Sequence, residues 1–299
     1  MSGAHKGNAG EFSAALADAV AQAANWTVRV DGRRRYAASG IIWADGVVVA
    51  ANHTVERDDD VTVTGPDGTE HEATSAGRDP GSDIVVLKVE GLTASAPRAD
   101  AVRVGMLVMA VGRARRGEAE ASLGIVSATG SGGRRSRRRR GGRMPEMIRP
   151  DVTMYPGFSG GPLVTVDGAL IGMNTSAFRG GSMTLPNATL EPIVEQLLAH
   201  GRLKRGYLGL TSQPVALPGE VATDEQSSGL LVIAVEEDSP ASSTGLMVGD
   251  ILIGIDGDPL RDTDDLRDAL GGDRAGSTAT LRIVRGGALH EVSATIGER

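Results

Sequence analysis

Three short segments of this 299-residue chain carry the side chains that acyl transfer requires. Ser159 lies within Gly157-Phe158-Ser159-Gly160-Gly161-Pro162, and glycines let a backbone curl around a carbonyl oxygen. His53 follows one apolar run, and Asp83 directly precedes another. Cleaving a peptide bond needs a nucleophile, a base that takes its proton, a group that orients the base, and donors for the oxyanion. We expect Ser159, His53 and Asp83 in the first three roles, and the backbone N–H groups of Gly157 and Ser159 in the fourth.

Each of these residues also has an ordinary structural interpretation. Ser159 could belong to a glycine-rich hairpin, and His53 could simply end a strand. The other histidines suit the role of base less well because they lie in the tail, a polar hairpin, a helix end and the C-terminal region: His5, His71, His200 and His290. Asp79 and the acidic run 58–60 compete with Asp83, but Asp83 alone immediately precedes an apolar strand that could bury its carboxylate.

The composition favours two domains rich in short strands. The length exceeds that of a typical single domain, and 42 glycines with 3% aromatic residues indicate many turns. There is no cysteine, and the five histidines form no ligand cluster such as H-x-x-x-H. We therefore predict neither a disulfide, a metal nor another cofactor.

The order of elements predicts antiparallel barrels. A short amphipathic helix is expected at 11–24. Strand-like runs follow without strand–helix alternation, at 27–30, 41–43, 47–51, 61–64, 84–89, 107–111, 124–128, 163–166 and 170–174. Leu190, Ile193, Val194, Leu197 and Leu198 repeat at helical spacing, with Gly201 just past the end. Residues 202–206 are expected to form an exposed linker.

The chain order His, Asp, Ser differs from that of subtilisin-like enzymes and of α/β-hydrolases. With the motifs around 53, 83 and 159, it resembles the HtrA (Deg) branch of the chymotrypsin-like proteases. From Tyr207-Leu208-Gly209-Leu210 onward, including residues 245–252, the sequence resembles a bacterial PDZ domain. The resemblance implies a mainly β protein, with a chymotrypsin-like double six-stranded antiparallel β-barrel and a C-terminal PDZ domain that is a small β-barrel with helices.

The expected domains are an N-terminal tail and helix (1–24), a trypsin-like serine protease domain (25–201), a linker (202–206) and a PDZ domain (207–299). In the PDZ domain Thr263 is expected to cap a helix, and a final hairpin is expected to cross Gly286-Gly287.

The same resemblance implies two recognition sites. The S1 pocket of the protease is expected to be lined by Tyr155, Asn174, Thr175, Ser176, Met183 and Leu185. None of these is acidic, which disfavours cleavage after Lys or Arg and favours a medium aliphatic residue. In the PDZ domain, the loop Tyr207-Leu208-Gly209-Leu210 is expected to capture a terminal carboxylate. Leu266 and Leu270 either line the pocket for the last side chain or are plain core residues.

Phe158 departs from the family, which usually has asparagine at this position. Trypsin-like digestive enzymes have an aspartate there that pairs with a newly cut N-terminus, and phenylalanine can do neither job. Activation by insertion of the N-terminus is therefore not expected. The loop is either held by packing or rests in an inactive form.

Seven arginines between 134 and 143 contrast with a net charge of −7 for the whole chain. Like charges at this density repel one another and keep the segment extended, so the simplest interpretation of the arginine tract is a disordered, solvated loop. Alternatives are docking to an acidic protein surface, nucleic acid or anionic lipid. No aromatic residue lies among the arginines to stack on a base, which disfavours specific single-strand recognition.

The resulting hypothesis is a serine endopeptidase of HtrA type that cleaves unfolded proteins in protein quality control and binds peptide C-termini through its PDZ domain. The alternative is a catalytically silent peptide-binding or chaperone-like scaffold with a deformed oxyanion loop. Family members are commonly trimers, and the apolar face of residues 12–20 suits such a contact. The start of the chain lacks the features of a secretory signal, and no run approaches a membrane span. We therefore expect a cytoplasmic protein as the sequence is given, or a periplasmic one if a leader precedes it.

Overall fold

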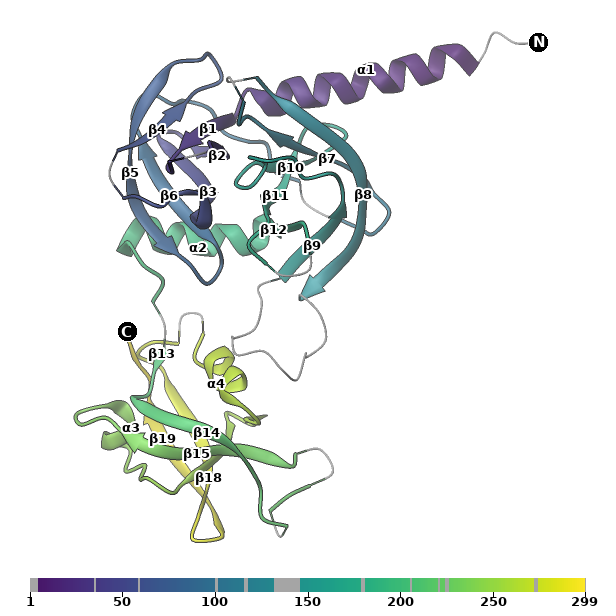
Figure 1. Cartoon of the computed structure of the whole chain (residues 1–299). Coiled ribbons are helices and arrows are strands. Elements are labelled where there is room, and N and C mark those ends of the chain that lie inside the picture. The colour runs from purple at the N-terminus through teal and green to yellow at the C-terminus, as the bar shows by residue number, and fades with distance from the viewer. Residues whose placement is uncertain are drawn as a thin grey trace. The chain divides into compact units, whose positions relative to one another are not determined.

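The computed structural model describes most of the chain in two compact units, one ending at Leu203 and one beginning at Lys204. The described residues are 5–34, 36–58, 60–99, 102–115, 118–131, 146–178, 181–204, 206–219, 221–223, 226–271 and 274–298. Each unit has its own hydrophobic core. The helices and strands of both units are labelled in Figure 1.

The first unit contains two closed six-stranded antiparallel barrels, which confirms the predicted architecture. The first barrel has the strand order β1-β2-β3-β6-β5-β4. Its strands are β1 (Thr27–Asp31), β2 (Ala38–Ala44), β3 (Val47–Ala51), β4 (Val61–Thr64), β5 (Glu70–Asp79) and β6 (Ile84–Val89). The second has the order β10-β11-β12-β9-β8-β7. Its strands are β7 (Leu107–Gly112), β8 (Glu120–Ser131), β9 (Glu146–Asp151), β10 (Pro162–Thr165), β11 (Leu170–Thr175) and β12 (Met183–Pro186).

Helix α2 (Asn187–His200) joins the two barrels by packing on strands of both. It contacts β5 and β6 of the first barrel and β11 and β12 of the second (Figure 1). Its buried side chains include Leu190, Val194 and Leu197 of the predicted apolar face. Gly201 ends the helix with φ of +72°, a conformation that costs glycine little. The predicted helix and its glycine cap are confirmed.

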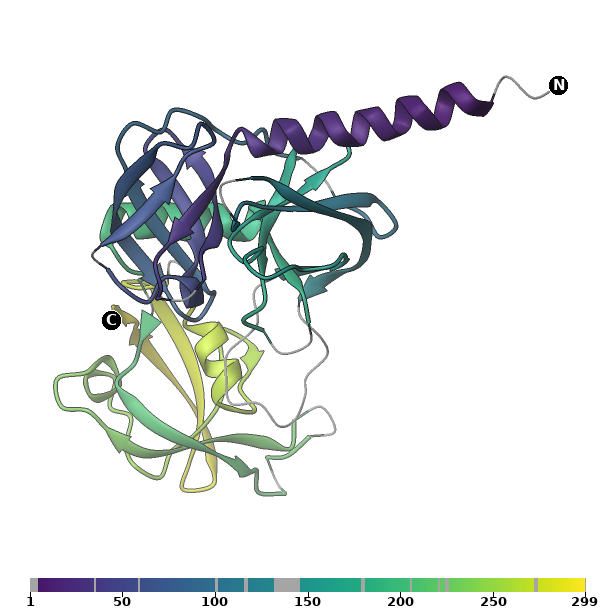
Figure 2. The same ribbon diagram turned by 45° about the horizontal axis from the view of Figure 1, so that its top comes forward.

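Helix α1 (His5–Ala24) is longer than the predicted segment 11–24. Ala19 and Ala23 near its C-terminal end are buried, whereas the Phe12 side chain is 48% exposed. Both views show the N-terminal part of the helix projecting from the barrels (Figures 1 and 2). Only the C-terminal turns of the helix therefore contribute to the barrel core.

The second unit is a six-stranded sheet with two short helices and a separate two-stranded sheet. The larger sheet contains β14 (Leu210–Ala216), β15 (Ser228–Val235), β16 (Ile251–Ile255), β17 (Asp258–Pro259), β18 (Thr278–Arg285) and β19 (Ala288–Thr295). The smaller pairs β13 (Gly206–Tyr207) with β20 (Gly297–Glu298). The helices are α3 (Pro240–Ser243) and α4 (Thr263–Ala269). The predicted hairpin is confirmed, because Arg285 pairs with Ala288 across two glycines with positive φ.

Two details differ from expectation. The cap of α4 is Asp262, whose carboxylate accepts hydrogen bonds from the N–H groups of Asp264 and Asp265; Thr263 is already the first helical residue. The prediction chose the hydroxyl although an equally good capping side chain precedes it. Strands β5 and β9 carry charged residues and do not resemble apolar runs, so they were absent from the predicted set.

The ion pair between Asp250 and Arg285 predicts acid sensitivity of the second unit. Burial alone would raise the pKa of the Asp250 carboxyl, but hydrogen bonds from Arg285 and the Met247 N–H outweigh it and lower that pKa. The stabilisation is therefore present above the unfolded pKa of about 4 and is lost as pH falls through the lower folded value.

We expect Asp250→Asn to destabilise the second unit at pH 7 and to remove this acid-dependent loss. Both tryptophans, Trp26 and Trp43, lie in the first unit. A change in circular dichroism on acidification that is not accompanied by a change in tryptophan fluorescence therefore reports unfolding of the second unit. The exposed Asp258→Asn is the matched control. An unchanged acid dependence in Asp250→Asn would contradict the assignment.

Candidate active site

The nucleophile loop, residues 155–161, begins with a tight turn before β10. The Phe158 N–H donates to the Tyr155 carbonyl at 3.0 Å, and Gly157 has φ of +95°. Pro156 occupies the preceding position, where its ring fixes φ near −65°. A positive φ at the third residue defines a type II turn, whereas type I needs a negative value there and turns the central peptide over. The Pro156–Gly157 peptide, which carries the Gly157 N–H, therefore has the orientation of a type II turn.

Close backbone approach requires glycine at several positions of this loop. A Cβ at Gly157 would lie 2.1 Å from the Ala114 Cβ, and one at Gly160 would lie 2.1 Å from the Ser39 carbonyl oxygen. Both contacts are impossible for a side chain. The nucleophile loop is thus seated against β2 and against the segment that follows β7.

The hydrogen bonds of the loop leave two N–H groups without an acceptor among the described residues. Phe158, Gly160 and Gly161 donate to the carbonyls of Tyr155, Asn174 and Phe158 respectively. The N–H groups of Gly157 and Ser159 donate to none of the described residues, and both residues are partly exposed. Because both residues are partly exposed, their N–H groups are open to solvent or to a ligand oxygen beside the serine hydroxyl.

His53 and Asp83 meet in the first barrel. The 3-10 turn η1 (Asn52–Thr54) follows β3 and carries His53, and Asp83 immediately precedes β6. The His53 Nδ1 lies 2.8 Å from Asp83 Oδ2, and the His53 backbone N–H donates to Oδ1 at 2.8 Å. Donation from Nδ1 leaves Nε2 with a lone pair, the tautomer that a general base needs. Asp83 is 3% exposed and has φ of +60°, which aspartate tolerates better than most residues.

Strand β11 brings the two barrels together at this point. The Thr175 hydroxyl donates to Asp83 Oδ2, and the next residue, Ser176, has its hydroxyl 3.0 Å from Ser159 Oγ. Among the described residues, Ser176 is the hydrogen-bond partner of the Ser159 hydroxyl; no bond joins that hydroxyl to His53. A rotation about χ1 moves a serine hydroxyl between staggered positions, and catalytic hydrogen bonds often tighten only when substrate binds. The three predicted residues are therefore connected through Thr175 and Ser176.

The residues predicted for the S1 pocket differ in how far they reach solvent. Tyr155 is 47% exposed and Ser176 is also exposed, whereas Met183 and Leu185 of β12 are buried. Asn174 is fully buried: its amide nitrogen donates to the Pro162 carbonyl, and its oxygen accepts from Thr184. Thr175 is also buried, with its hydroxyl on Asp83. Their role in a substrate pocket stays a prediction.

Phe158 belongs to the core of the second barrel. It is fully buried in a cluster with Val108, Ala110, Val126, Ile148, Leu163 and Ile171. Tyr155 meets its ring edge-on at a centroid distance of 5.3 Å. The ring also lies over Gly112, where a Cβ would come within 2.5 Å. Packing therefore holds the Phe158 side chain in place. Along the chain Phe158 lies between Gly157 and Ser159, whose N–H groups have no acceptor among the described residues.

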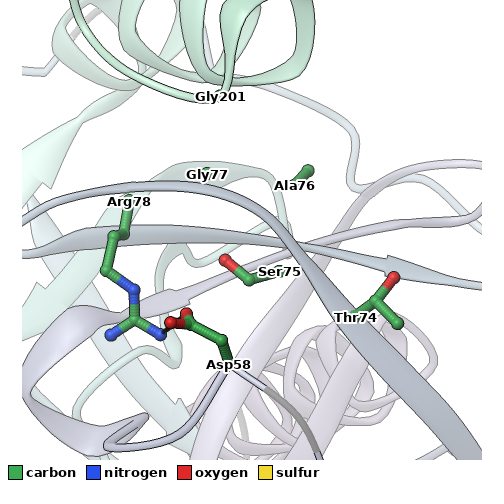
Figure 3. A pocket seen from close by; sticks show the side chains of 7 residues that line it. All are labelled: Asp58, Thr74, Ser75, Ala76, Gly77, Arg78 and Gly201. Atoms are coloured by element: carbon green, nitrogen blue, oxygen red, sulfur yellow. Dashed lines mark hydrogen bonds and ion pairs between the residues drawn. The ribbon is translucent and has the colours of Figure 1, made fainter.

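Arg78 supports the turn that carries His53, and sequence reasoning missed it. Its guanidinium donates to Asn52 Oδ1 at 3.2 Å and to the Val55 carbonyl at 2.9 Å, and it pairs with Asp58. A shallow pocket surrounds this arginine at the C-terminal end of α2 (Figure 3). The pocket holds none of the three predicted catalytic residues. A charged residue near the end of a strand gives no signal of such a role.

In the second unit, the predicted carboxylate loop has free donors as well. The N–H groups of Leu208 and Gly209 donate to no described residue, and Gly209 has φ of +76°. The Tyr207 hydroxyl bonds to Glu236, the Leu208 side chain is buried, and Leu210 begins β14. Leu266 is in the core cluster of this unit and Leu270 packs against it. The groove role of these two leucines stays a prediction.

The arginine tract at 134–143 lies outside the described residues. Within the described residues, no group of three metal-ligating side chains could hold an ion. No helix in the described part of the chain has the length and apolar character needed to span a membrane.

The fold and the site together define a trypsin-like peptidase domain joined to a PDZ domain. Family models with these descriptions match residues 38–173 and 206–296. A probable periplasmic serine endoprotease, DegP-like, from Ectopseudomonas mendocina is 36% identical over 280 residues, covering 89% of this chain and 58% of that protein. One of the same description from Brucella suis is 32% identical, with coverage of 89% and 53%. The chain spans about half the length of the curated relatives it matches.

Solved structures agree over nearly the whole chain. The serine endoprotease from Yersinia pestis has a TM-score of 0.75 at 28% identity, covering 95% of this chain and 98% of that one. The HtrA-type protease AlgW with a decapeptide has the same TM-score and coverage at 27% identity. This chain is homologous to the DegP/HtrA serine endoproteases.

We expect Phe158→Ala to destabilise the first unit by about 3–5 kcal/mol, because it empties a fully buried aromatic site. Tryptophan fluorescence in urea measures the change. Phe12→Ala makes the same substitution at a half-exposed site and should cost far less. Equal losses in the two variants would show that Phe158 does not anchor the loop.

Proposed function

We propose that the protein is a serine endopeptidase of HtrA type that cleaves unfolded polypeptides. The observation that carries this proposal is that the N–H groups of Gly157 and Ser159, on either side of the fully buried Phe158, have no acceptor in the part of the chain that the structure describes. Such donors stabilise the oxyanion of a tetrahedral intermediate. The His53–Asp83 pair at 2.8 Å supports the same function.

In the proposed mechanism, Ser159 Oγ leaves Ser176 and turns toward His53 when a substrate enters. His53 Nε2 takes the hydroxyl proton as Oγ bonds to the carbonyl carbon, and the carbonyl electron pair moves to oxygen, which the Gly157 and Ser159 N–H groups bind. His53 then returns the proton to the leaving amine, and water repeats the cycle on the acyl-enzyme. Asp83 holds the imidazole in the required tautomer and stabilises its cation. Thr175 orients Asp83 from the other barrel.

The second candidate function is a catalytically silent scaffold that binds peptides. The Ser159–Ser176 hydrogen bond favours it, because that bond directs the nucleophile to a group that cannot act as a base at neutral pH. The type II turn and the two N–H groups without a described acceptor favour the enzyme, because a scaffold has no need of donors turned toward a bound oxygen.

Covalent labelling separates the two functions. We expect a fluorophosphonate to label the wild type and casein to be digested, Ser159→Ala to abolish both, and Asp83→Asn to lower turnover about 10⁴-fold through the wrong imidazole tautomer. Ser293→Ala, at an exposed site on β19, should behave as wild type. No labelling and no digestion in any protein would favour the scaffold.

We propose that the second unit captures peptide C-termini at the Leu208 and Gly209 N–H groups. The carboxylate would accept hydrogen bonds from donors that no described residue occupies. The peptide would add as a strand beside β14. The solved AlgW complex with a decapeptide supports peptide binding in this family.

Calorimetric titration tests this site. Peptides ending in an apolar residue with a free carboxylate should bind at least about tenfold more tightly than their amidated forms, because a charge-assisted hydrogen bond contributes about 1.5–3 kcal/mol. Gly209→Ala should abolish binding, since its Cβ would lie 2.2 Å from the Ser239 Cβ. Gly219→Ala has open space and is the control. Equal affinity for amidated peptides would argue against carboxylate capture.

The remaining features of the proposal concern assembly and location. A trimer built through the exposed part of α1, which includes Phe12, stays a prediction. The curated relatives are named as periplasmic, which favours the extracytoplasmic alternative for this chain. Binding of nucleic acid or anionic surfaces by the arginine tract stays a secondary prediction.

A further inference from the structure

Ser39 is a fully buried polar residue in the apolar strand β2, and its bonds lie where the two barrels meet. Its N–H donates to the Ser159 carbonyl at 3.2 Å, and its hydroxyl donates to the Gly157 carbonyl at 2.8 Å. One serine of the first barrel therefore binds two carbonyls of the nucleophile loop, one on each side of Phe158.

The hydroxyl of Ser39 helps to fix the peptide that adjoins the Gly157 donor. The Gly157–Phe158 peptide is bonded at both ends, through its carbonyl to Ser39 and through its N–H to Tyr155. The Gly157 N–H is joined to this fixed plane through only the two backbone dihedrals of Gly157. The direction of the Gly157 N–H therefore depends on how firmly the Gly157–Phe158 peptide is held. The N–H itself has no hydrogen bond among the described residues that could hold it instead.

The Ser39 hydroxyl takes part in a second hydrogen bond, in which its oxygen is the acceptor. Ser39 Oγ accepts from the Arg113 N–H at 2.8 Å, so its single proton is directed toward Gly157. The Arg113 guanidinium, itself buried, donates to the carbonyls of Ala24 and Thr27 at 2.8 Å. Those carbonyls mark the end of α1 and the start of β1, so the bonds run from α1 through Arg113 and Ser39 to the nucleophile loop.

From these contacts we infer that Ser39 is a positioning residue for the oxyanion donor of Gly157, and that Arg113 ties this donor to the end of α1. The inference rests on the proposed function, since it assigns the donor a role in catalysis. Removing the Ser39 hydroxyl takes the donor from the partly buried Gly157 carbonyl and the acceptor from the buried Arg113 N–H, and this frees the turn to exchange type II for type I. The donor is then displaced, while His53 and Asp83 are untouched.

Steady-state kinetics of the full chain on a peptide substrate tests the inference. Ser39→Ala should lower kcat about 10- to 100-fold, less than the roughly 10²–10³-fold loss for a deleted donor, with little change in KM. The pH profile should keep its midpoint, because His53 keeps its partners. Ser39→Cys, nearly isosteric with a weaker donor, should fall between Ala and wild type. Thr165→Val removes another buried hydroxyl bond in the same unit and should keep kcat within about twofold.

A crystal structure of Ser39→Ala gives a readout that does not need activity. Loss of the positive φ at Gly157, or of the Tyr155–Phe158 hydrogen bond, supports the inference. An unchanged type II turn together with an unchanged kcat in Ser39→Ala overturns the inference. The inference is also overturned if Thr165→Val, at an equal loss of stability, lowers kcat as much as Ser39→Ala does. If the wild type neither hydrolyses peptides nor labels, the proposed function fails, and the turn in Ser39→Ala then decides the inference alone.

Discussion

The close approach of the nucleophile loop to strand β2 is the constraint on which the candidate site depends. Gly160 passes so near the Ser39 carbonyl that a Cβ would lie 2.1 Å from its oxygen, and a Cβ at Gly161 would lie 2.4 Å from the Val111 carbonyl oxygen. The loop belongs to one barrel and Ser39 to the other, so the barrels cannot separate or slide without moving the loop. Fixing the interface between barrels thus fixes the geometry at Ser159.

Phe158 shows how packing can replace a charge at a loop that must be held still. A buried aspartate or asparagine in such a position needs polar partners, because an unpaired polar group in a low-dielectric interior is costly. A phenylalanine needs only space and neighbours, which the second barrel supplies through its core cluster and through the open position over Gly112. A loop held this way is insensitive to pH at that point and needs no new N-terminus. Its order depends on the barrel core instead.

The sequence was sufficient to predict the barrels and to nominate His53, Asp83 and Ser159, because apolar alternation and short motifs are local signals. It was insufficient for Ser39, Arg78 and Arg113, whose partners lie 20 to 118 positions away along the chain. Hydrogen bonds to backbone carbonyls impose no pattern on the sequence around the partner. The strands β5 and β9 were missed for a related reason, since they are half exposed and carry charges.

The pattern of bonded and free N–H groups distinguishes the two candidate functions better than the resting rotamer of Ser159. A hydroxyl can turn between staggered positions in nanoseconds or less, so its bond to Ser176 describes one of several accessible states. The free donors depend on backbone bonds, on buried Phe158 and on glycines with no room for a side chain, and these change only if the loop refolds. Two peptide donors that have no acceptor among the described residues, held through so many contacts, support the proposed enzyme, because an oxyanion needs such donors and a peptide-binding scaffold does not.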